Sequence, residues 1–113
     1  MATRLPHGAL AIVDFTKIEG YCLNPSHPRG CHKARVFQKT LSLTQKDAGW
    51  LREALLAAAE RDGATRMSSD AWGDQWRLDA NVTRHGRSTV VRTIWIIRTG
   101  EFRPRFVSVW VLL

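Results

Sequence analysis

Several motifs that would identify a class of enzyme are missing from this sequence. Neither GxxxxGK[ST] nor GxGxxG occurs, so there is no Gly-rich nucleotide loop, and there is no GxSxG motif to carry a nucleophilic serine. The ten acidic residues are dispersed along the chain, so paired-carboxylate and two-metal sites have no visible anchor. These absences argue against nucleotide-binding proteins, serine hydrolases and two-metal enzymes.

Cysteine is scarce, and long hydrophobic runs are absent. Cys22 and Cys31 could close a small loop, but two free thiols in a cytosolic protein is the plainer interpretation. With His27 and His32 they also suggest a metal site, yet their spacing lacks the tight pairs of zinc sites, so we expect no metal or other cofactor. No stretch approaches the ~20 apolar residues that span a bilayer. The first 15 residues also do not resemble a signal peptide, so a cytoplasmic protein without membrane contact is expected.

Negative charge is in short supply as well. Lys and Arg number 17 against 10 Asp and Glu, which gives a formal net charge of +7 and favours a polyanionic partner such as RNA or DNA. The cations are scattered, so a basic protein without such a partner is the alternative. A hydrophobic content of 44% with five tryptophans predicts a packed fold. At 113 residues the chain is expected to form one domain, residues 1–113, that buries roughly 65% of its unfolded surface.

Two helices are predicted in the first half of the chain. Residues 31–41 and 45–61 both place apolar side chains at helical spacing. Thr44 is expected as the N-cap of the second helix, with Asp47 in the position of a capping box, and Gly63 as its C-terminal cap.

Strands are predicted on both sides of these helices. Residues 9–15 form a short strand or lead-in, and residues 16–21 a helical turn. After Gly63 the candidate strands are residues 66–69, 75–82, 88–98 and 105–112. Their connections are too short for crossover helices, so the sheet should be largely antiparallel. We therefore expect an α+β fold, with N-terminal helices packed on a curved sheet of three to five strands.

Alternation along the last two strands divides their side chains between two faces. Thr93 and Trp95 are expected on one face and Arg92 on the other. The last strand is expected to place Arg105, Val107, Val109 and Val111 on one face and Phe106, Ser108, Trp110 and Leu112 on the other. Thr93 and Trp95 could meet residues of the opening loop, although β-propensity alone explains both equally well.

The segment NPSHPRGCHKAR, residues 24–35, gathers two prolines, a glycine, two histidines and three cations. Pro25 and Pro28 remove backbone donors and bias the residues before them towards extended geometry, so a loop is expected there. Its turn formers are explained by architecture alone. Histidines beside cations are also what a phosphate-handling site would use.

RNA cleavage by attack of the 2′-hydroxyl needs a base, an acid and a group that stabilises the charged phosphate. Histidine is the usual general acid or base of proteins, so His27 and His32 are the candidates for these roles. Lys33 supplies fixed charge, and Thr93 can donate a hydrogen bond. Further RNA-binding roles are assigned to Arg35, to Arg92 and Arg105 as bidentate phosphate ligands, and to Tyr21 and Trp95 as stacking residues.

The opening motif resembles the signature of a family of small bacterial and phage proteins that also occurs as a C-terminal module of polymorphic toxins. That signature reads Y-x-L-N-P-x-H-P-x-G-x-x-K-A-x-x-F, and Tyr21, His27 and Lys33 stand at matching positions. Two later motifs, V-R-T-x-W-I and P-R-hydrophobic-V, match residues 91–96 and 104–107.

The element order of this family is similar to that of the barnase, EndoU, colicin and RelE-like nucleases. Colicin D-like tRNA nucleases of that group place a Lys-His cluster near a strand with Ser-x-Trp. The pair His32-Lys33 and the run Thr93-Ile94-Trp95 resemble that combination in reversed or substituted form. The resemblance implies RNA cleavage, with tRNA among the candidate substrates, and leaves His32 at a variable position of the signature.

Our leading hypothesis is a metal-independent endoribonuclease of toxin type. His27 would act as general acid or base, Lys33 and Arg92 would stabilise the phosphate, Thr93 would donate to it, and Trp95 would position a base or pack beneath the site. Such an enzyme implies an acidic antitoxin or immunity protein that exploits the excess positive charge. The alternative is a noncatalytic basic module, of phage origin, that binds nucleic acid or an acidic protein.

Overall fold

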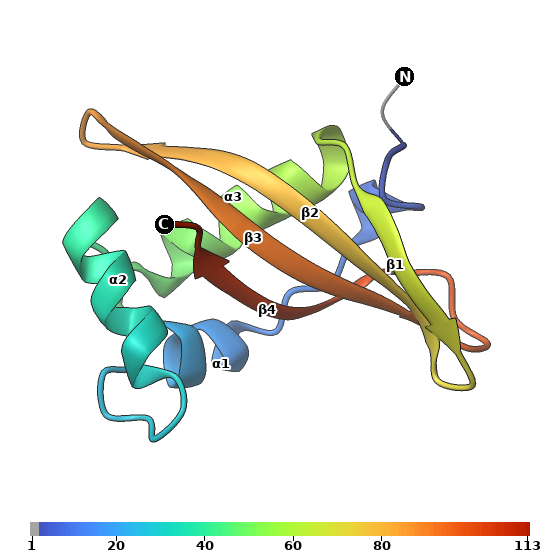
Figure 1. Ribbon diagram of the computed structural model, residues 1–113, viewed down its shortest axis with the longest axis horizontal. Coiled ribbons are helices and arrows are strands. Elements are labelled where there is room, and N and C mark those ends of the chain that lie inside the picture. Colours follow the sequence, from blue (N-terminus) through green and yellow to red (C-terminus); the bar gives the residue numbers. More distant parts are fainter. Residues whose placement is uncertain (1–2) are drawn as a thin grey trace.

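The computed structural model describes residues 3–113, which form an α+β fold with three helices and an open four-stranded antiparallel sheet (Figure 1). The helices are α1 (Phe15–Lys17), which continues into a π-helical turn (Ile18–Cys22), α2 (Cys31–Leu41) and α3 (Ala48–Arg61). The strands are β1 (Thr65–Asp70), β2 (Gly73–Arg84), β3 (Arg87–Arg98) and β4 (Arg105–Val111), adjacent in chain order. The predicted fold class is confirmed, and each predicted strand after Gly63 is present with slightly different bounds.

The start of α3 is built as the sequence predicts, whereas its end is not. The Thr44 backbone N–H donates to Asp47 Oδ2 at 2.9 Å, and a 3-10 turn (Gln45–Asp47) leads into the helix. The expected cap at Gly63 is wrong, because the cap residue is Asp62 in an extended conformation and Gly63 forms a β-bridge with Arg4. No helix within residues 3–113 is long and apolar enough to span a membrane.

The β2–β3 hairpin is the longest pairing in the sheet. It runs without interruption from the Gly73–Arg98 pair to the Arg84–Arg87 pair. His85 and Gly86 form the two-residue turn between the strands, with φ values of 50° and 75°. Positive φ at both positions matches the twist of the flanking strands, so this turn favours hairpin closure in register.

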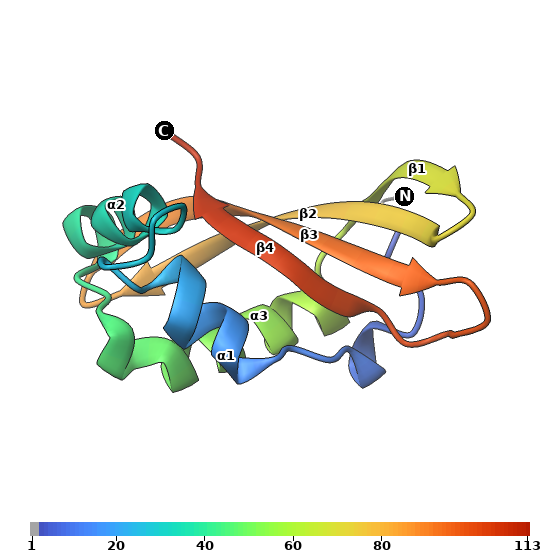
Figure 2. The ribbon, with the colours of Figure 1, turned by 90° about the horizontal axis from the view of Figure 1, so that it is seen from below.

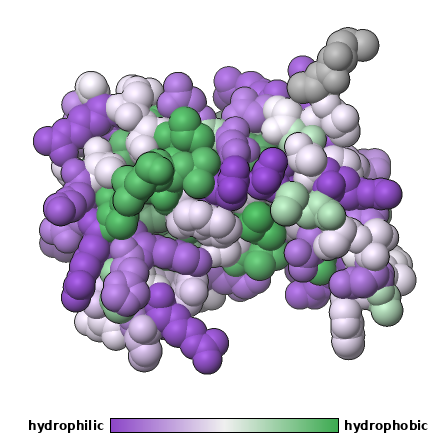
Figure 3. Space-filling model, viewed as in Figure 1, coloured by the Kyte–Doolittle hydropathy of each residue, from purple (hydrophilic) through white to green (hydrophobic). Residues whose placement is uncertain are grey.

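Helices α1 and α3 lie on one face of the sheet, and the other face is open. In Figure 2, α1 and α3 lie below the sheet, while α2 stands beside the C-terminal end of β4 at the level of the sheet. The largest fully buried side chains lie between the sheet and the helices: Trp95, Phe37, Phe106, Ile18, Leu23, Leu41, Leu43, Leu51, Leu55, Leu78, Val91 and Val109. The open face is the one towards the viewer in Figures 1 and 3.

The segment before α1 covers the edge of β4. The Ile12 backbone N–H donates to the Pro104 carbonyl at 2.9 Å, and its carbonyl accepts from the Phe106 N–H at 2.8 Å. Lys17 Nζ donates to the Phe106 carbonyl at 3.0 Å. The lead-in expected at residues 9–15 is therefore a 3-10 turn (Gly8–Leu10) followed by a parallel bridge that satisfies an otherwise exposed strand edge.

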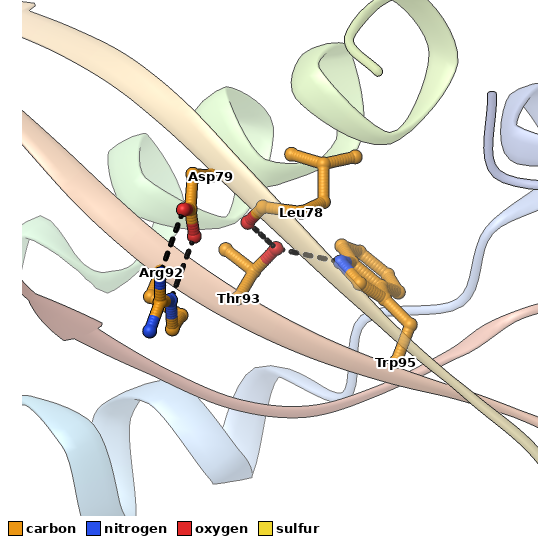
Figure 4. A network of polar contacts seen from close by, with 5 residues as sticks. All are labelled: Leu78, Asp79, Arg92, Thr93 and Trp95. Atoms are coloured by element: carbon orange, nitrogen blue, oxygen red, sulfur yellow. Dashed lines mark hydrogen bonds and ion pairs between the residues drawn. The ribbon is translucent and has the colours of Figure 1, made fainter. Parts of the chain in front are cut away.

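Thr93 is the one polar residue buried in the core of the described chain, and its hydroxyl both donates and accepts a hydrogen bond. The hydroxyl donates to the Leu78 carbonyl at 2.6 Å and accepts from Trp95 Nε1 at 2.7 Å (Figure 4). A buried indole N–H without an acceptor would carry its whole desolvation cost. Thr93 therefore allows a tryptophan to occupy the centre of the core.

We predict that Thr93→Val, which conserves shape but removes the hydroxyl, lowers the free energy of unfolding by about 1–3 kcal/mol, because it leaves the Trp95 indole without an acceptor. Urea unfolding followed by circular dichroism measures this change. Thr65→Val, at an exposed position of β1, is the matched control. Equal stability of the two variants would contradict the prediction.

Candidate functional site

An irregularity in β4 decides which of its side chains reach the surface. Ile94 pairs with Ser108 and Trp95 pairs with Phe106, so Val107 is an extra residue, as in a β-bulge. Beyond it the alternation shifts by one residue. Phe106, Val109 and Val111 are buried, while Arg105, Ser108 and Trp110 are half-buried on the open side. The predicted division of this strand into faces is therefore wrong, because simple alternation contains no bulge.

Lys33 connects α2 to this strand. Its Nζ donates to Ser108 Oγ at 2.8 Å and lies 5.0 Å from the centroid of the Tyr21 ring and 5.1 Å from that of the Trp110 ring. Both distances are within the range of cation–π attraction. The ammonium has three donors, of which Ser108 takes one. A cation is thus held between two aromatic rings and a hydroxyl at the surface.

The loop before α2 is shaped by hydrogen bonds of its own side chains. Asn24 Oδ1 accepts from the Ser26 N–H at 2.9 Å, and Asn24 Nδ2 donates to the Gly20 carbonyl at 3.2 Å. Gly30 packs against the backbone of Tyr21 so closely that a Cβ atom would clash with the Tyr21 carbonyl oxygen. The motif residues of this loop therefore fix its path across the π-helical turn.

His27 is held by the same loop in one tautomer. Its Nδ1 accepts the backbone N–H groups of Arg29 and Gly30, each at 3.0 Å. Its ring packs edge-to-face on Tyr21, with centroids 4.7 Å apart. Because an Nδ1 that accepts two hydrogen bonds cannot carry a proton, the proton of the neutral ring lies on Nε2. In this conformation His27 offers a hydrogen-bond donor rather than a base.

Tyr21, His27, Lys33, Ser108 and Trp110 form one cluster, the Lys33 cluster, and the remaining α2 candidates lie beside it. A shallow depression of about 370 Å³ is lined by His32, Lys33, Val36, Trp110 and Val111. His32 is exposed at its rim. Arg35 is also exposed and lines a neighbouring depression with His32. The structure thus brings Tyr21, His27 and Lys33 together, with His32 next to them.

Thr93 and Trp95 do not belong to this cluster. Both side chains are fully buried, and the Thr93 hydroxyl has no free hydrogen to offer a phosphate (Figure 4). The expectations that Thr93 donates to the phosphate and that Trp95 stacks on a base are corrected, because burial removes both from contact with RNA. Ser108 and Trp110 lie where Thr93 and Trp95 had been expected, next to the residues of the opening loop. Their spacing is itself Ser-x-Trp, the signal that sequence reasoning missed.

Arg92 and Arg105 each have a carboxylate partner. Arg92 Nε and Nη2 donate to the two oxygens of Asp79 at 2.9 and 3.0 Å (Figure 4), and Arg105 donates in the same way to Glu101 at 3.1 and 2.9 Å. The hydrogen bonds from these guanidinium groups hold the pKa values of Asp79 and Glu101 below their usual range. In each arginine the carboxylate occupies the Nε–Nη2 edge of the guanidinium group, so that edge can bind a phosphate only when the carboxylate leaves.

Cys22 lies behind the cluster and is inaccessible to solvent. Burial raises the pKa of its thiol, against the smaller lowering effects of the Val109 backbone, Lys33 and Ser108. Both Cys22 and Cys31 are unpaired in the structure. Within residues 3–113, no group of three or more His, Cys, Asp or Glu side chains is arranged to hold a metal ion.

We predict that Lys33→Met and Ser108→Ala show a coupling energy of about 0.5–1.5 kcal/mol in a double-mutant cycle of urea unfolding, because each variant removes the same hydrogen bond. Lys39→Met, an exposed lysine of the same helix, serves as the control in a second cycle with Ser108→Ala. Additive effects of the Lys33 and Ser108 variants within about 0.3 kcal/mol would contradict the contact.

Comparisons with known proteins identify a family and a fold. A family model described as a domain of unknown function (DUF6883) matches residues 4–113. No curated protein sequence matches the chain significantly. One similar solved structure is a contact-dependent growth inhibition toxin–immunity protein complex from Klebsiella pneumoniae 342, with a TM-score of 0.71 and 15% sequence identity. The alignment covers 94% of this chain and 97% of the matched chain, so the two share a fold.

Proposed function

The chain belongs to the DUF6883 family, and we propose that it is a metal-independent endoribonuclease of toxin type. The observation that carries this proposal is the Lys33 ammonium, held on Ser108 between Tyr21 and Trp110 and close to the His27 loop. A lysine beside Ser-x-Trp is the combination of residue types that the resemblance to colicin D-like tRNA nucleases implies.

Each group of the cluster has a task in cleavage by the 2′-hydroxyl. Lys33 stabilises the negative charge that develops on the phosphate, and Ser108 fixes the ammonium and takes the donor role first assigned to Thr93. His27 donates from Nε2 to a phosphate oxygen. His32, exposed at the rim, takes up the proton of the attacking 2′-hydroxyl as the 2′-oxygen bonds to phosphorus. The P–O5′ bond breaks, the leaving 5′-oxygen takes a proton from solvent, and the products are a 2′,3′-cyclic phosphate and a 5′-hydroxyl.

Aromatic rings supply the contact with a base. Tyr21 and Trp110 lie on either side of Lys33 at the surface, and stacking on one base is worth about 1–3 kcal/mol by alanine substitution. Arg92, the cross-strand neighbour of Trp110, extends the basic surface onto the sheet. The RNA substrate would thus approach the cluster from the open side of the sheet.

The toxin assignment rests on charge as well as on fold. The similar Klebsiella structure is a complex of a toxin with an immunity protein, and the matched chain is one of the two. A net charge of +7 suits a protein that acts on RNA better than one that inhibits such an enzyme. An acidic antitoxin or immunity protein is the partner that this charge implies.

We predict that the purified protein cleaves bacterial RNA in the presence of EDTA and that His27→Asn abolishes the cleavage while leaving the fold intact. Asn places an oxygen where His27 Nδ1 lies, so it keeps the two backbone hydrogen bonds, but it has no group at the Nε2 position. Cleavage should fall at least about 100-fold. RNA electrophoresis and thermal unfolding are the two measurements.

Two further variants make this test selective. His27→Ala removes the backbone contacts as well and should lower stability by about 1–2 kcal/mol. His85→Asn, in the β2–β3 turn far along the chain, is the matched control, because Asn tolerates the left-handed conformation found there. Full cleavage by His27→Asn would refute the role of Nε2.

The second candidate function is the noncatalytic basic binding module. The observation in its favour is that His27 Nδ1 already accepts two N–H groups, as a residue with a purely architectural role would. If a folded, inhibitor-free protein binds RNA but leaves it uncut, this function is the correct one.

A further inference from the structure

The open face of the sheet combines cations with an apolar surface. Its side chains form rows across the strands: Trp110, Arg92 and Asp79 in the first, Ser108, Ile94 and Arg77 in the second, and Arg105, Ile96 and Gln75 in the third. In Figure 3, hydrophobic groups gather near the C-terminus and along the middle of this face, with hydrophilic groups between them. No helix covers them (Figure 2).

Cations outnumber acids on this face. Its cations are Arg77, Arg92, Arg98 and Arg105, with Lys33 at the margin. Its acids are Asp79, Asp70 in the row of Arg98, and the neighbouring Glu101. Asp79 and Glu101 are each bound bidentately by an arginine, whereas Asp70 accepts from the backbone N–H groups of Trp72 and Gly73. A surface that is cationic in sum, with apolar side chains between the charges, is complementary to a chain of phosphates that carries flat apolar groups.

The two ion pairs present guanidinium groups in the geometry that a phosphate would use, since carboxylate and phosphate both accept the same two parallel N–H groups. The side chains of Arg92 and Asp79 are 30% and 33% exposed, and those of Arg105 and Glu101 are 34% and 37% exposed. Ion pairs with this exposure contribute little to stability. Replacement of the carboxylate by a phosphate therefore costs the fold little.

We propose that this face binds a single-stranded segment of RNA and that Asp79 and Glu101 are internal phosphate mimics, which occupy the Arg92 and Arg105 guanidinium groups until RNA phosphates displace them. The site lies beyond the Lys33 cluster and deepens the proposed function, on which the choice of RNA rests. Binding of RNA to the face does not itself require cleavage.

The apolar part of the face selects an unpaired strand. Ile94 and Ile96 are half-buried along β3, and Trp110 lies next to Arg92 on β4. Bases can lie on such a surface only when they are not enclosed in a duplex. Arg105 pairs with Ile96, four residues along β3 from Arg92, so the backbone positions of the two arginines lie about 13 Å apart in the strand direction. A strand that contacts both would run along β3 towards Trp110 and Lys33.

The test measures binding of a fluorescent single-stranded RNA with 2′-O-methyl groups, which cannot be cleaved by its own 2′-oxygen. We expect Asp79→Asn and Glu101→Gln each to tighten binding about two- to fivefold, because each frees a guanidinium group. Each should also steepen the plot of log affinity against log salt by about 0.7. Arg77→Gln, which removes a cation without a carboxylate partner among the described contacts, should weaken binding.

Three controls decide the outcome. Glu60→Gln makes the same charge change at an exposed position of α3, on the covered side of the sheet, and should leave the affinity unchanged. Unchanged binding in Asp79→Asn and Glu101→Gln would overturn the proposal. The proposal would also be overturned if the two variants gained as much affinity for an RNA duplex of the same length. An equal gain in affinity for polyglutamate would overturn it too, because it would indicate a surface for an acidic protein.

Failure of this inference is distinguishable from failure of the proposed function. In one outcome the wild-type protein cleaves RNA, but the Asp79 and Glu101 variants bind the uncleavable strand as the wild type does. The proposed nuclease function is then correct, and the sheet face is not its RNA-binding surface. If the variants bind more tightly while no RNA is cut, the face binds RNA in a protein that is not a nuclease. Thermal unfolding of each variant confirms that the changes in binding do not arise from lost structure.

Discussion

The candidate site depends on one extra residue in β4. Val107 has no partner in β3, and this bulge turns Ser108 and Trp110 outward while Phe106, Val109 and Val111 stay in the core. Without it, strict alternation from Phe106 would bury Ser108 and Trp110 and expose Val109 and Val111. The contacts of Lys33 with Ser108 and Trp110 follow from this local irregularity, and they join the helical half of the protein to the sheet.

The helical half and the sheet position the candidate site in different ways. The loop before α2 fixes its own shape through Asn24, His27 and the close packing of Gly30 on Tyr21. The Tyr21 ring and the His27 imidazole are therefore positioned before any ligand binds. The sheet supplies a rigid floor, because the β2–β3 hairpin is paired along its whole length. Preorganised donors of this kind are worth more to a reaction than the same groups on mobile side chains.

Part of the positive charge on the open face is paired with carboxylates. Its excess of cations would attract any polyanion, yet the Arg92 and Arg105 guanidinium groups of the open face are already bound by carboxylates. Such pairs contribute little to stability, so their physical effect is on what the surface binds and how strongly salt affects that binding. The Lys33 ammonium, by contrast, contacts only a hydroxyl and two rings among the interactions described, which leaves its charge available.

The sequence by itself determined the α+β order, the helix start at Thr44 and the hairpin turn at His85 and Gly86, because short-range periodicity and turn chemistry encode all of these. Tyr21, His27 and Lys33 stood together in the sequence only as positions of the signature that it resembles. Only the tertiary structure decided that Thr93 and Trp95 are core residues and that Ser108 and Trp110 are not. Alternation gives two faces without saying which is buried, and a bulge reverses the assignment partway along a strand. The tautomer of His27 and the carboxylate partners of Arg92 and Arg105 are likewise contacts that folding creates.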